Sequence, residues 1–271
     1  MSRLCIVTAL PAETRPLLDV LKLRQIKARH LRLYGADQYL LLETGPGKLN
    51  TAAGVGALLQ AYSEIDIVVN IGIAGGTFDY ATVLAAHHVQ DVASGAQWFP
   101  HLPDNKSFKN IQSAVVNTLD APNTQYRDGI LFDMEAAGIF SAGSRYLSTS
   151  QIHSFKIVSD NPDHDIRDIS KKSVVALITQ ALPSLLPLLE TLQDLDITPD
   201  HGKDALTDAL IAETSTRTHH SVNDEQLLRQ LVQRYLVLTG NLPTIDKQAV
   251  SAKDVRLALQ KALDEQPFVY G

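Results

Sequence analysis

The chain has 271 residues, of which 45% are hydrophobic and 20% are charged, a composition that is ordinary for a globular protein with a full core. Its formal net charge of -6 offers no basic surface to nucleic acid or to an anionic membrane, so the expected partner is a small molecule. Cys5 is the single cysteine, which excludes an intrachain disulfide and a thiolate metal cluster and favours the cytoplasm.

Strand-like runs alternate with helix-like segments over the first 195 residues. Strands are expected at six apolar or β-branched runs, residues 4–8, 39–43, 65–71, 83–92, 130–132 and 155–158. Helices are expected at four segments, residues 11–21, 50–62, 134–146 and 182–192. Asn50 or Thr51 is the expected N-cap of the second helix. These repeated units predict an α/β fold with a mostly parallel central sheet flanked by helices.

Two apolar segments resemble targeting or membrane sequences at first sight. The first, residues 4–10, is short and is followed by Pro11 and by the charge of Glu13, so we expect a strand and no signal peptide. The second, residues 182–192, is shorter than the ~20 residues of a membrane span and contains two prolines and a glutamate. We therefore expect a packed helix there.

The pattern changes after Asp194, where strand-like runs stop. Helical patterns follow at residues 205–212, 226–238 and 254–263, and Ser251 is a candidate cap for the last of them. Basic and acidic residues roughly balance in this part, whereas a helix-turn-helix reader of DNA would carry a basic face. The sequence predicts two domains, an α/β domain over residues 1–195 and a C-terminal helical extension over residues 201–271.

Three carboxylates follow strand-like runs of the first domain. Glu13 closes the first run, and the dipeptides Met134-Glu135 and Ser159-Asp160 close two later ones. Open α/β sheets bind small ligands at the carboxyl ends of their strands, where these residues are expected to meet. Cleavage of a bond between a sugar carbon and a base nitrogen needs one neutral and one ionised carboxyl group. Each carboxylate alone is equally compatible with a helix terminus or a turn.

Two glycine-rich segments end strand-like runs. Residues 45–48 lack the Walker pattern, because Leu42 and Leu49 stand where a glycine and a Ser or Thr are required. Residues 72–76 lack the dinucleotide spacing of glycines. They remain a strand end at which a ligand can touch backbone amides, or alternatively a tight turn.

Taken together, the chain resembles the nucleoside phosphorylase and nucleosidase superfamily, particularly the hydrolases of 5'-methylthioadenosine, S-adenosylhomocysteine or futalosine. The matching segments come in the same order, at residues 6–13, 44–50, 70–76, 133–136 and 158–160. The resemblance covers about residues 3–195 and leaves the tail uncovered. It implies a nucleoside phosphorylase-like fold.

The resemblance also implies roles for individual residues. Glu13 activates water, Asp160 protonates a purine-like base, and Glu135 accepts hydrogen bonds from the ribose hydroxyls. Met134 packs against the sugar, and Ser159 orients Asp160. The substrate-binding residues that the resemblance implies are Gly47, Ile73, Ala74, Gly75, Met134, Glu135 and Ser159.

The departures from the superfamily favour one reaction. Its phosphorylases hold phosphate with an Arg and a Ser around the central strand end, where this chain has Asn70 and Ile73. Water is therefore the expected nucleophile, with no cofactor and no metal, in a homodimer. The segment 91–133 is shorter than in the adenosine-type nucleosidases, which leaves the base and the 5' substituent open. Two alternatives remain, a phosphate-dependent phosphorylase and a catalytically silent nucleoside-binding or regulatory protein.

Overall fold

The computed structural model describes residues 3–103, 105–195, 201–216, 218, 221–239, 241–245 and 251–264. The chain divides into two compact units, Met1–Ile197 and Thr198–Gly271. The first unit contains the sheet and the helices around it, and the described residues of the second form helices.

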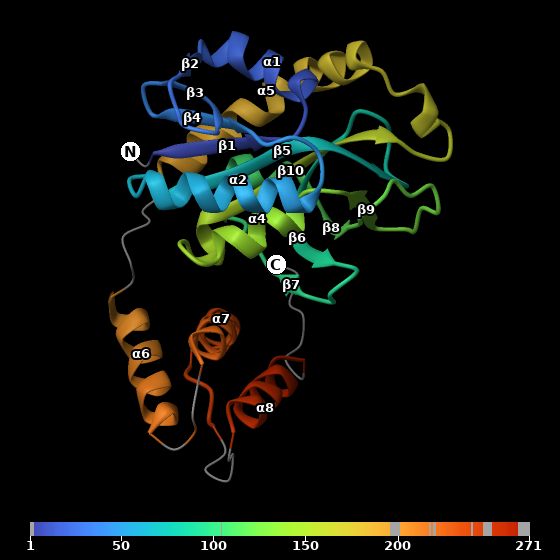
Figure 1. Ribbon diagram of the computed structural model, residues 1–271. Helices are drawn as coiled ribbons and strands as arrows, with labels where there is room; N and C mark the ends of the chain where they lie inside the picture. The colour runs from blue at the N-terminus through green and yellow to red at the C-terminus, as the bar shows by residue number, and fades with distance from the viewer. Residues whose placement is uncertain are drawn as a thin grey trace. The chain divides into compact units, whose positions relative to one another are not determined.

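The first unit is built on a mixed sheet (Figure 1). Its strands are β1 Leu4–Thr8, β2 Arg24–Ile26, β3 Arg32–Ala36, β4 Tyr39–Glu43, β5 Ile67–Gly76, β6 Val83–Asp91, β7 Gln97–Trp98, β8 Gln112–Thr118, β9 Ile130–Asp133 and β10 Ile152–Asp160. Its α-helices are α1 Pro11–Leu21, α2 Lys48–Ala61, α3 Lys106–Lys109, α4 Ala136–Gly143 and α5 Lys171–Gln193. Short 3₁₀ helices cover Thr149–Gln151 and Ile166–Asp168.

Strand β5 is the centre of the sheet. It pairs in parallel with β1 and with β10, and in antiparallel with β9. The path β9–β8–β6–β10 returns to β5, so these strands close into a barrel, and β1, β4, β3 and β2 extend the sheet from its side. The ends of β1, β5, β9 and β10 are thereby brought to one place.

The sequence-based prediction of a mostly parallel sheet is wrong about the strand directions, because the sheet is mixed. Among the described residues, five strand pairings are parallel and five are antiparallel. Two antiparallel pairings, β5 with β9 and β6 with β10, belong to the barrel itself. Others come from β2, β3 and β7, short strands whose sequences show no strand pattern. The sequence pattern reports which residues are extended, but the direction of pairing depends on the route of the chain between strands.

Helices cover both faces of the sheet, as the sequence predicts (Figure 1). Alternate residues of β1 point to opposite faces. Leu4 and Ile6 join the core under α1 and α5, whereas Cys5 and Val7 join the core under α2 and α4. Strand β1 is therefore buried on both faces of the sheet.

Helix α5 is the packed helix expected around residues 182–192, and it is longer than expected. Among the described residues, α5 is a helix that by its length and composition could cross a membrane. Core helices share this composition, and here Leu177, Ile178, Leu185 and Leu189 are buried in the cluster that contains α1. Pro183 and Pro187 lie inside the helix.

Several element boundaries differ from the sequence-based expectation. Strand β5 continues through Gly76, so the glycine segment 72–76 lies inside the strand and is not a turn after it. Helix α2 begins at Lys48, because Gly47 with φ of 91° is its N-cap; Asn50 and Thr51 lie inside the helix. No element is expected from the sequence in the segment 97–126, which contains three prolines, yet β7, α3 and β8 lie in it.

The second unit contains α6 His201–Ser215, α7 Val222–Thr239 and α8 Ala252–Asp264. Helices α7 and α8 share an apolar cluster of Leu228, Val232, Leu236, Val255 and Leu259. The expected cap of the last helix is confirmed, since Ser251 Oγ accepts a hydrogen bond from the N–H of Asp254 at 3.2 Å.

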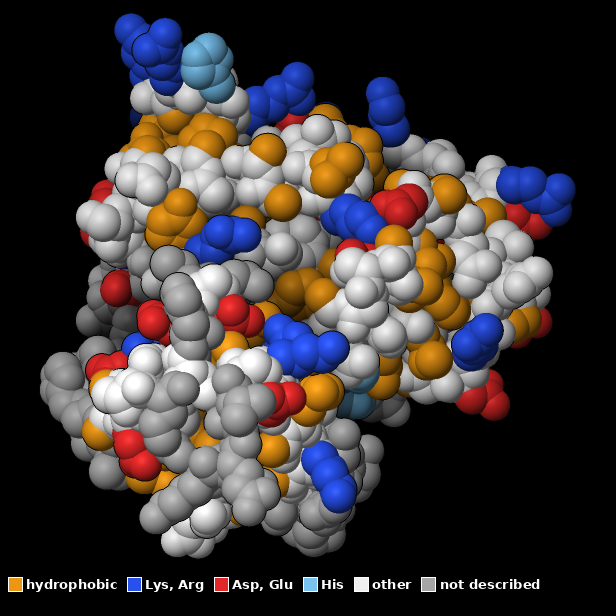
Figure 2. Space-filling model, turned by 60° about the horizontal axis from the view of Figure 1, so that its bottom comes forward, with side chains coloured by type: hydrophobic (Ala, Val, Ile, Leu, Met, Phe, Trp, Pro, Cys, Tyr) orange, Lys and Arg blue, Asp and Glu red, His pale blue; other side chains and the backbone are white. Residues whose placement is uncertain are grey.

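Charged side chains are mixed on the face shown in Figure 2. Lys and Arg side chains of the described residues are interspersed there with Asp, Glu and hydrophobic side chains, and they form no single basic patch on that face.

The contact between α2 and α4 depends on Gly138. A Cβ atom at this position would lie 2.1 Å from the carbonyl oxygen of Lys48, whereas a Cβ at Gly56 would meet nothing within 4 Å. We expect Gly138→Ala to lower the free energy of unfolding by about 1–3 kcal/mol, since the helices must move apart. Gly56→Ala is the matched control and should be neutral or stabilising by up to ~1 kcal/mol. Urea unfolding of both variants tests this; an equal effect of the two substitutions would contradict it.

Candidate functional site

One pocket lies at the ends of β1, β5, β9 and β10. Its volume is about 160 Å³. Of the predicted site residues, eight line it: Glu13, Ile73, Ala74, Gly75, Met134, Glu135, Ser159 and Asp160. The remaining wall comes from Ala9 and Leu10 after β1, from Pro46, from Leu119, Ala121, Pro122 and Asn123 after β8, from Phe132 and Asp133 at the end of β9, and from Ile166 and Ile169 after β10. Residues scattered over the whole first unit are thus brought together as the sequence predicts.

Glu13 lies in the first turn of α1 and is 3% exposed. Its Oε2 accepts hydrogen bonds from the N–H groups of Ala9 and Leu10, both at 2.9 Å. Its Oε1 accepts one from the N–H of Ile73 at 3.0 Å. Burial raises the pKa of Glu13, and the N–H donors and the nearby charge of Lys156 oppose that rise. The carboxyl group therefore ties the first helix to β5.

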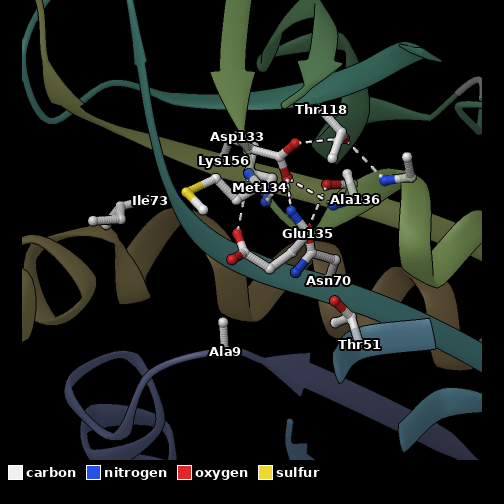
Figure 3. Close-up of polar contacts among 12 residues, drawn as sticks. Ala9, Thr51, Asn70, Ile73, Thr118, Asp133, Met134, Glu135, Ala136 and Lys156 are labelled. Atoms are coloured by element: carbon white, nitrogen blue, oxygen red, sulfur yellow. Dashed lines mark hydrogen bonds and ion pairs between the residues drawn. The ribbon is translucent and has the colours of Figure 1, made fainter. Parts of the chain in front are cut away.

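Asp133, which also lines the pocket, forms a buried ion pair with Lys156 (Figure 3). The Nζ atom lies 2.7 Å from Asp133 Oδ2, and the two side chains are 1% and 0% exposed. Asp133 also accepts hydrogen bonds from Thr118 Oγ1 at 2.6 Å and from the N–H of Ala136 at 2.8 Å. Both of its oxygens thereby have partners, as a buried charge requires. The charges of Asp133, Glu135 and Glu13 raise the pKa of Lys156 against the effect of burial, so it stays an ammonium.

Glu135 faces the glycine loop. Its Oε1 accepts a hydrogen bond from the N–H of Gly47 at 2.8 Å. Burial raises its pKa, Asp133 raises it further, and Lys156 lowers it. Gly47 is therefore held by the carboxylate, and its N–H is not free for a ligand; it is also not among the residues that line the pocket. The same holds for the N–H of Ile73, which Glu13 uses.

Asp160 receives a hydroxyl donor on each oxygen. Ser159 Oγ donates to Oδ1 at 2.5 Å. Tyr126 Oη donates to Oδ2 at 2.6 Å. Asp160 is 2% exposed and belongs to the end of β10.

Sequence reasoning missed Asp133, Lys156 and Tyr126 as parts of this site. Lys156 had a readable signal, because it interrupts an otherwise apolar strand, Phe155 to Val158. A charged residue in a strand that is buried on both faces needs a buried partner. Tyr126 had no such signal, since it lies in the turn-rich segment before β9.

The buried ion pair makes a testable contribution to stability. Lys156→Met leaves the Asp133 carboxylate buried without its cation, so we expect the free energy of unfolding to fall by about 3–5 kcal/mol at neutral pH. Arg3→Met is the matched control. It removes a pair that is 36% and 50% exposed, and its effect should be about 0.2–1 kcal/mol.

Chemical unfolding of the two variants and of the double variant Lys156→Met with Asp133→Asn measures this. The double variant should recover part of the loss, because it removes the orphaned charge. A Lys156→Met protein as stable as Arg3→Met would contradict the assignment.

The sequence matches no family profile and no curated protein. Solved structures do resemble it. The 5'-methylthioadenosine nucleosidase of Arabidopsis thaliana is 16% identical with a TM-score of 0.63, over 72% of this chain and 98% of that one. The 5'-methylthioadenosine/S-adenosylhomocysteine nucleosidases of Campylobacter jejuni and S. pneumoniae are 14% and 18% identical. Their TM-scores are 0.56 and 0.57, each over 70% of this chain and 100% and 99% of theirs. The chain therefore has the nucleoside phosphorylase and nucleosidase fold that the resemblance implies.

Proposed function

We propose that the protein is a nucleosidase that hydrolyses the N-glycosidic bond of a purine-type or modified nucleoside. The observation that carries the proposal is the arrangement of Glu13, Glu135 and Asp160, three carboxylates on separate elements that line one pocket. The fold shared with solved nucleosidases supports it. Each carboxyl group then has a place in the reaction.

The three carboxyl groups divide the reaction between them in this proposal. Asp160 protonates the departing base, and Glu135 binds the ribose hydroxyls and faces the cationic sugar in the transition state. Glu13 takes a proton from the attacking water. Burial raises the pKa of Glu13 and of Glu135, and the ammonium of Lys156 lowers both; at Glu13 the N–H groups of Leu10 and Ile73 lower the pKa more than Lys156 does. Lys156 thus supports the charged forms that the chemistry uses without facing the substrate.

Water is favoured over phosphate as the nucleophile. A phosphate site needs cationic or hydroxyl donors. Asn70 is buried in β5, where its Nδ2 donates to the carbonyl oxygen of Val7 and its Oδ1 accepts from Ser154 Oγ. Ile73 presents an aliphatic side chain to the pocket. Neither residue offers phosphate a donor.

The nature of the product tests this proposal. We expect free base and free ribose, or its 5'-modified form, when the purified protein is incubated with a panel of purine and 5'-modified nucleosides. The rate should not change when phosphate is added. Chromatographic detection of the sugar product distinguishes the outcomes. A ribose 1-phosphate product formed at a rate proportional to phosphate would make the protein a phosphorylase, and binding without turnover would make it a nucleoside-binding protein.

The division of roles between Asp160 and Glu135 is tested by the leaving group. Asp160→Asn removes the transferable proton, so hydrolysis of a purine nucleoside should slow by ~10²–10⁴-fold. A 4-nitrophenyl riboside, whose leaving group needs no protonation, should be cleaved by this variant at nearly the wild-type rate. Glu135→Gln should stay slow on both substrates, because it loses an acceptor beside the cationic sugar.

Single-turnover kinetics measures both variants. In Glu135→Gln the amide oxygen can still accept the N–H of Gly47, so the loop contact is kept. The second oxygen, which accepts the N–H of Met134 at 3.3 Å, is replaced by a donor group. Asp163→Asn is the control for Asp160→Asn, since the Asp163 side chain is exposed after β10. Equal impairment of Asp160→Asn on the two substrates would remove its role as the acid.

The proposal also includes a homodimer without cofactor or metal, located in the cytoplasm, and it leaves the C-terminal helices outside the reaction. Size-exclusion chromatography with light scattering gives the oligomeric state directly.

A further inference from the structure

The Tyr126 side chain holds the same carboxylate that the proposed reaction assigns to the base. Its Oη donates to Asp160 Oδ2 at 2.6 Å, and Ser159 Oγ takes the other oxygen at 2.5 Å. Burial, followed by the hydrogen bond to Asp160, raises the pKa of Tyr126 far above its ordinary value. The phenol therefore stays a donor at physiological pH. A ligand can bond Asp160 Oδ2 in this direction only in place of Tyr126.

The ring of Tyr126 lies beside Gly75, which lines the pocket, although Tyr126 itself is not among the residues of the pocket wall. A Cβ atom at Gly75 would lie 3.0 Å from Tyr126 Cε1 and 2.2 Å from Asp160 Oδ2. The missing side chain at Gly75 is thus what admits both the flat ring and the carboxylate. A planar aromatic ring on Gly75, with a polar edge atom on Asp160, is the arrangement that a nucleobase would adopt in this pocket.

The segment that carries Tyr126 is held mainly by contacts near the surface. Asp120, at its start, is bound by Lys48 Nζ at 2.9 Å, and its side chain is 67% exposed. Near its end, Thr77 Oγ1 donates to the carbonyl oxygen of Arg127 at 3.5 Å, and Gly129 has φ of 74°. An ion pair with an exposed partner, such as Asp120 here, contributes little to the stability of the folded segment. The segment can therefore move at a small cost, although Tyr126 is anchored at Asp160.

We propose that Tyr126 is an internal occupant of the base subsite and a specificity-determining residue. The leaving base binds by taking its place on Asp160 and over Gly75. This inference rests on the proposed nucleosidase function for the identity of the ligand. A base enters only if its own ring nitrogen replaces the phenol as the partner of Asp160. Tyr126 thereby competes with every base, and it determines specificity by excluding flat rings that lack such an atom.

Tyr126→Phe tests the competition, because it removes the hydroxyl and keeps the ring. The probes are the free bases adenine, hypoxanthine and uracil, with benzene as a flat ring that has no polar atom, and binding is measured by isothermal titration calorimetry. We expect at least one base to bind about tenfold or more tightly to Tyr126→Phe than to the wild type, because only in the wild type must the Tyr126–Asp160 hydrogen bond be broken before a base binds. With nucleoside, KM should fall and kcat should stay unchanged.

Tyr146→Phe is the matched control. Its Oη bonds Gln60 Oε1 at 3.3 Å, between α2 and the residues after α4, and neither residue lines the pocket. Its base affinity should equal that of the wild type. Tyr126→Ala empties the subsite further and should admit benzene, which the wild type should exclude.

The outcomes separate this inference from the proposed function. Tighter base binding in Tyr126→Phe without turnover of any nucleoside leaves the inference standing and overturns the nucleosidase proposal. Turnover of a nucleoside together with unchanged or weaker base binding in Tyr126→Phe supports the nucleosidase proposal and overturns the inference about Tyr126. A fall in kcat with KM unchanged would place Tyr126 in the chemical step and overturn its role as a competitor. No binding of any base to the wild type, Tyr126→Phe or Tyr126→Ala would also overturn it.

Discussion

The ammonium of Lys156 lies in the interior of the first unit, 2.7 Å from the carboxylate of Asp133. Taking two charges out of water costs several kcal/mol for each, and only a close partner and filled hydrogen bonds offset that cost. Here Thr118 Oγ1 and the N–H of Ala136 complete the set around Asp133. The cation also acts on Glu135, whose pKa burial raises and Lys156 lowers. A group of buried carboxylates at one end of a sheet is therefore held together by one buried cation, and the site proposed here depends on it.

Close approach is the second constraint, and β5 provides it. A side chain at Gly72 would lie 3.0 Å from Glu13 Oε1, and one at Gly75 would lie 2.2 Å from Asp160 Oδ2. Strand β5 needs no side chains of its own at Gly72 and Gly75, because the neighbouring elements supply the polar groups there. It pairs with β1, β9 and β10, whose ends carry Glu13, Asp133 and Asp160 or lead to them. The glycine segment is thus a floor of the pocket, in contrast to the turn that remained possible from the sequence.

Some elements with a strong local signal were predicted with their observed bounds. Strand β1 and helix α1 are examples: a compact apolar run is followed by Pro11, which favours the first turn of a helix. Strand β8 was missed because its neighbours are prolines and polar residues that predict turns. The cap of α2 was misplaced, since the positive φ of Gly47 ends the preceding loop one turn earlier than Asn50. These differences come from geometry that a pattern of residue types does not contain.

The sequence by itself determined the alternation of strands and helices, the order of the carboxylates along the chain and their place at strand ends. These features depend on residue type and spacing, which local preference and burial decide. Only the tertiary structure decided the directions of the strands and the partners of the buried charges. Lys156 meets Asp133, and Tyr126 meets Asp160 across 34 residues, because the register of β5 with β9 and β10 brings those strand ends together. Such a register is fixed by the closure of the barrel as a whole, and no single segment of the sequence carries it.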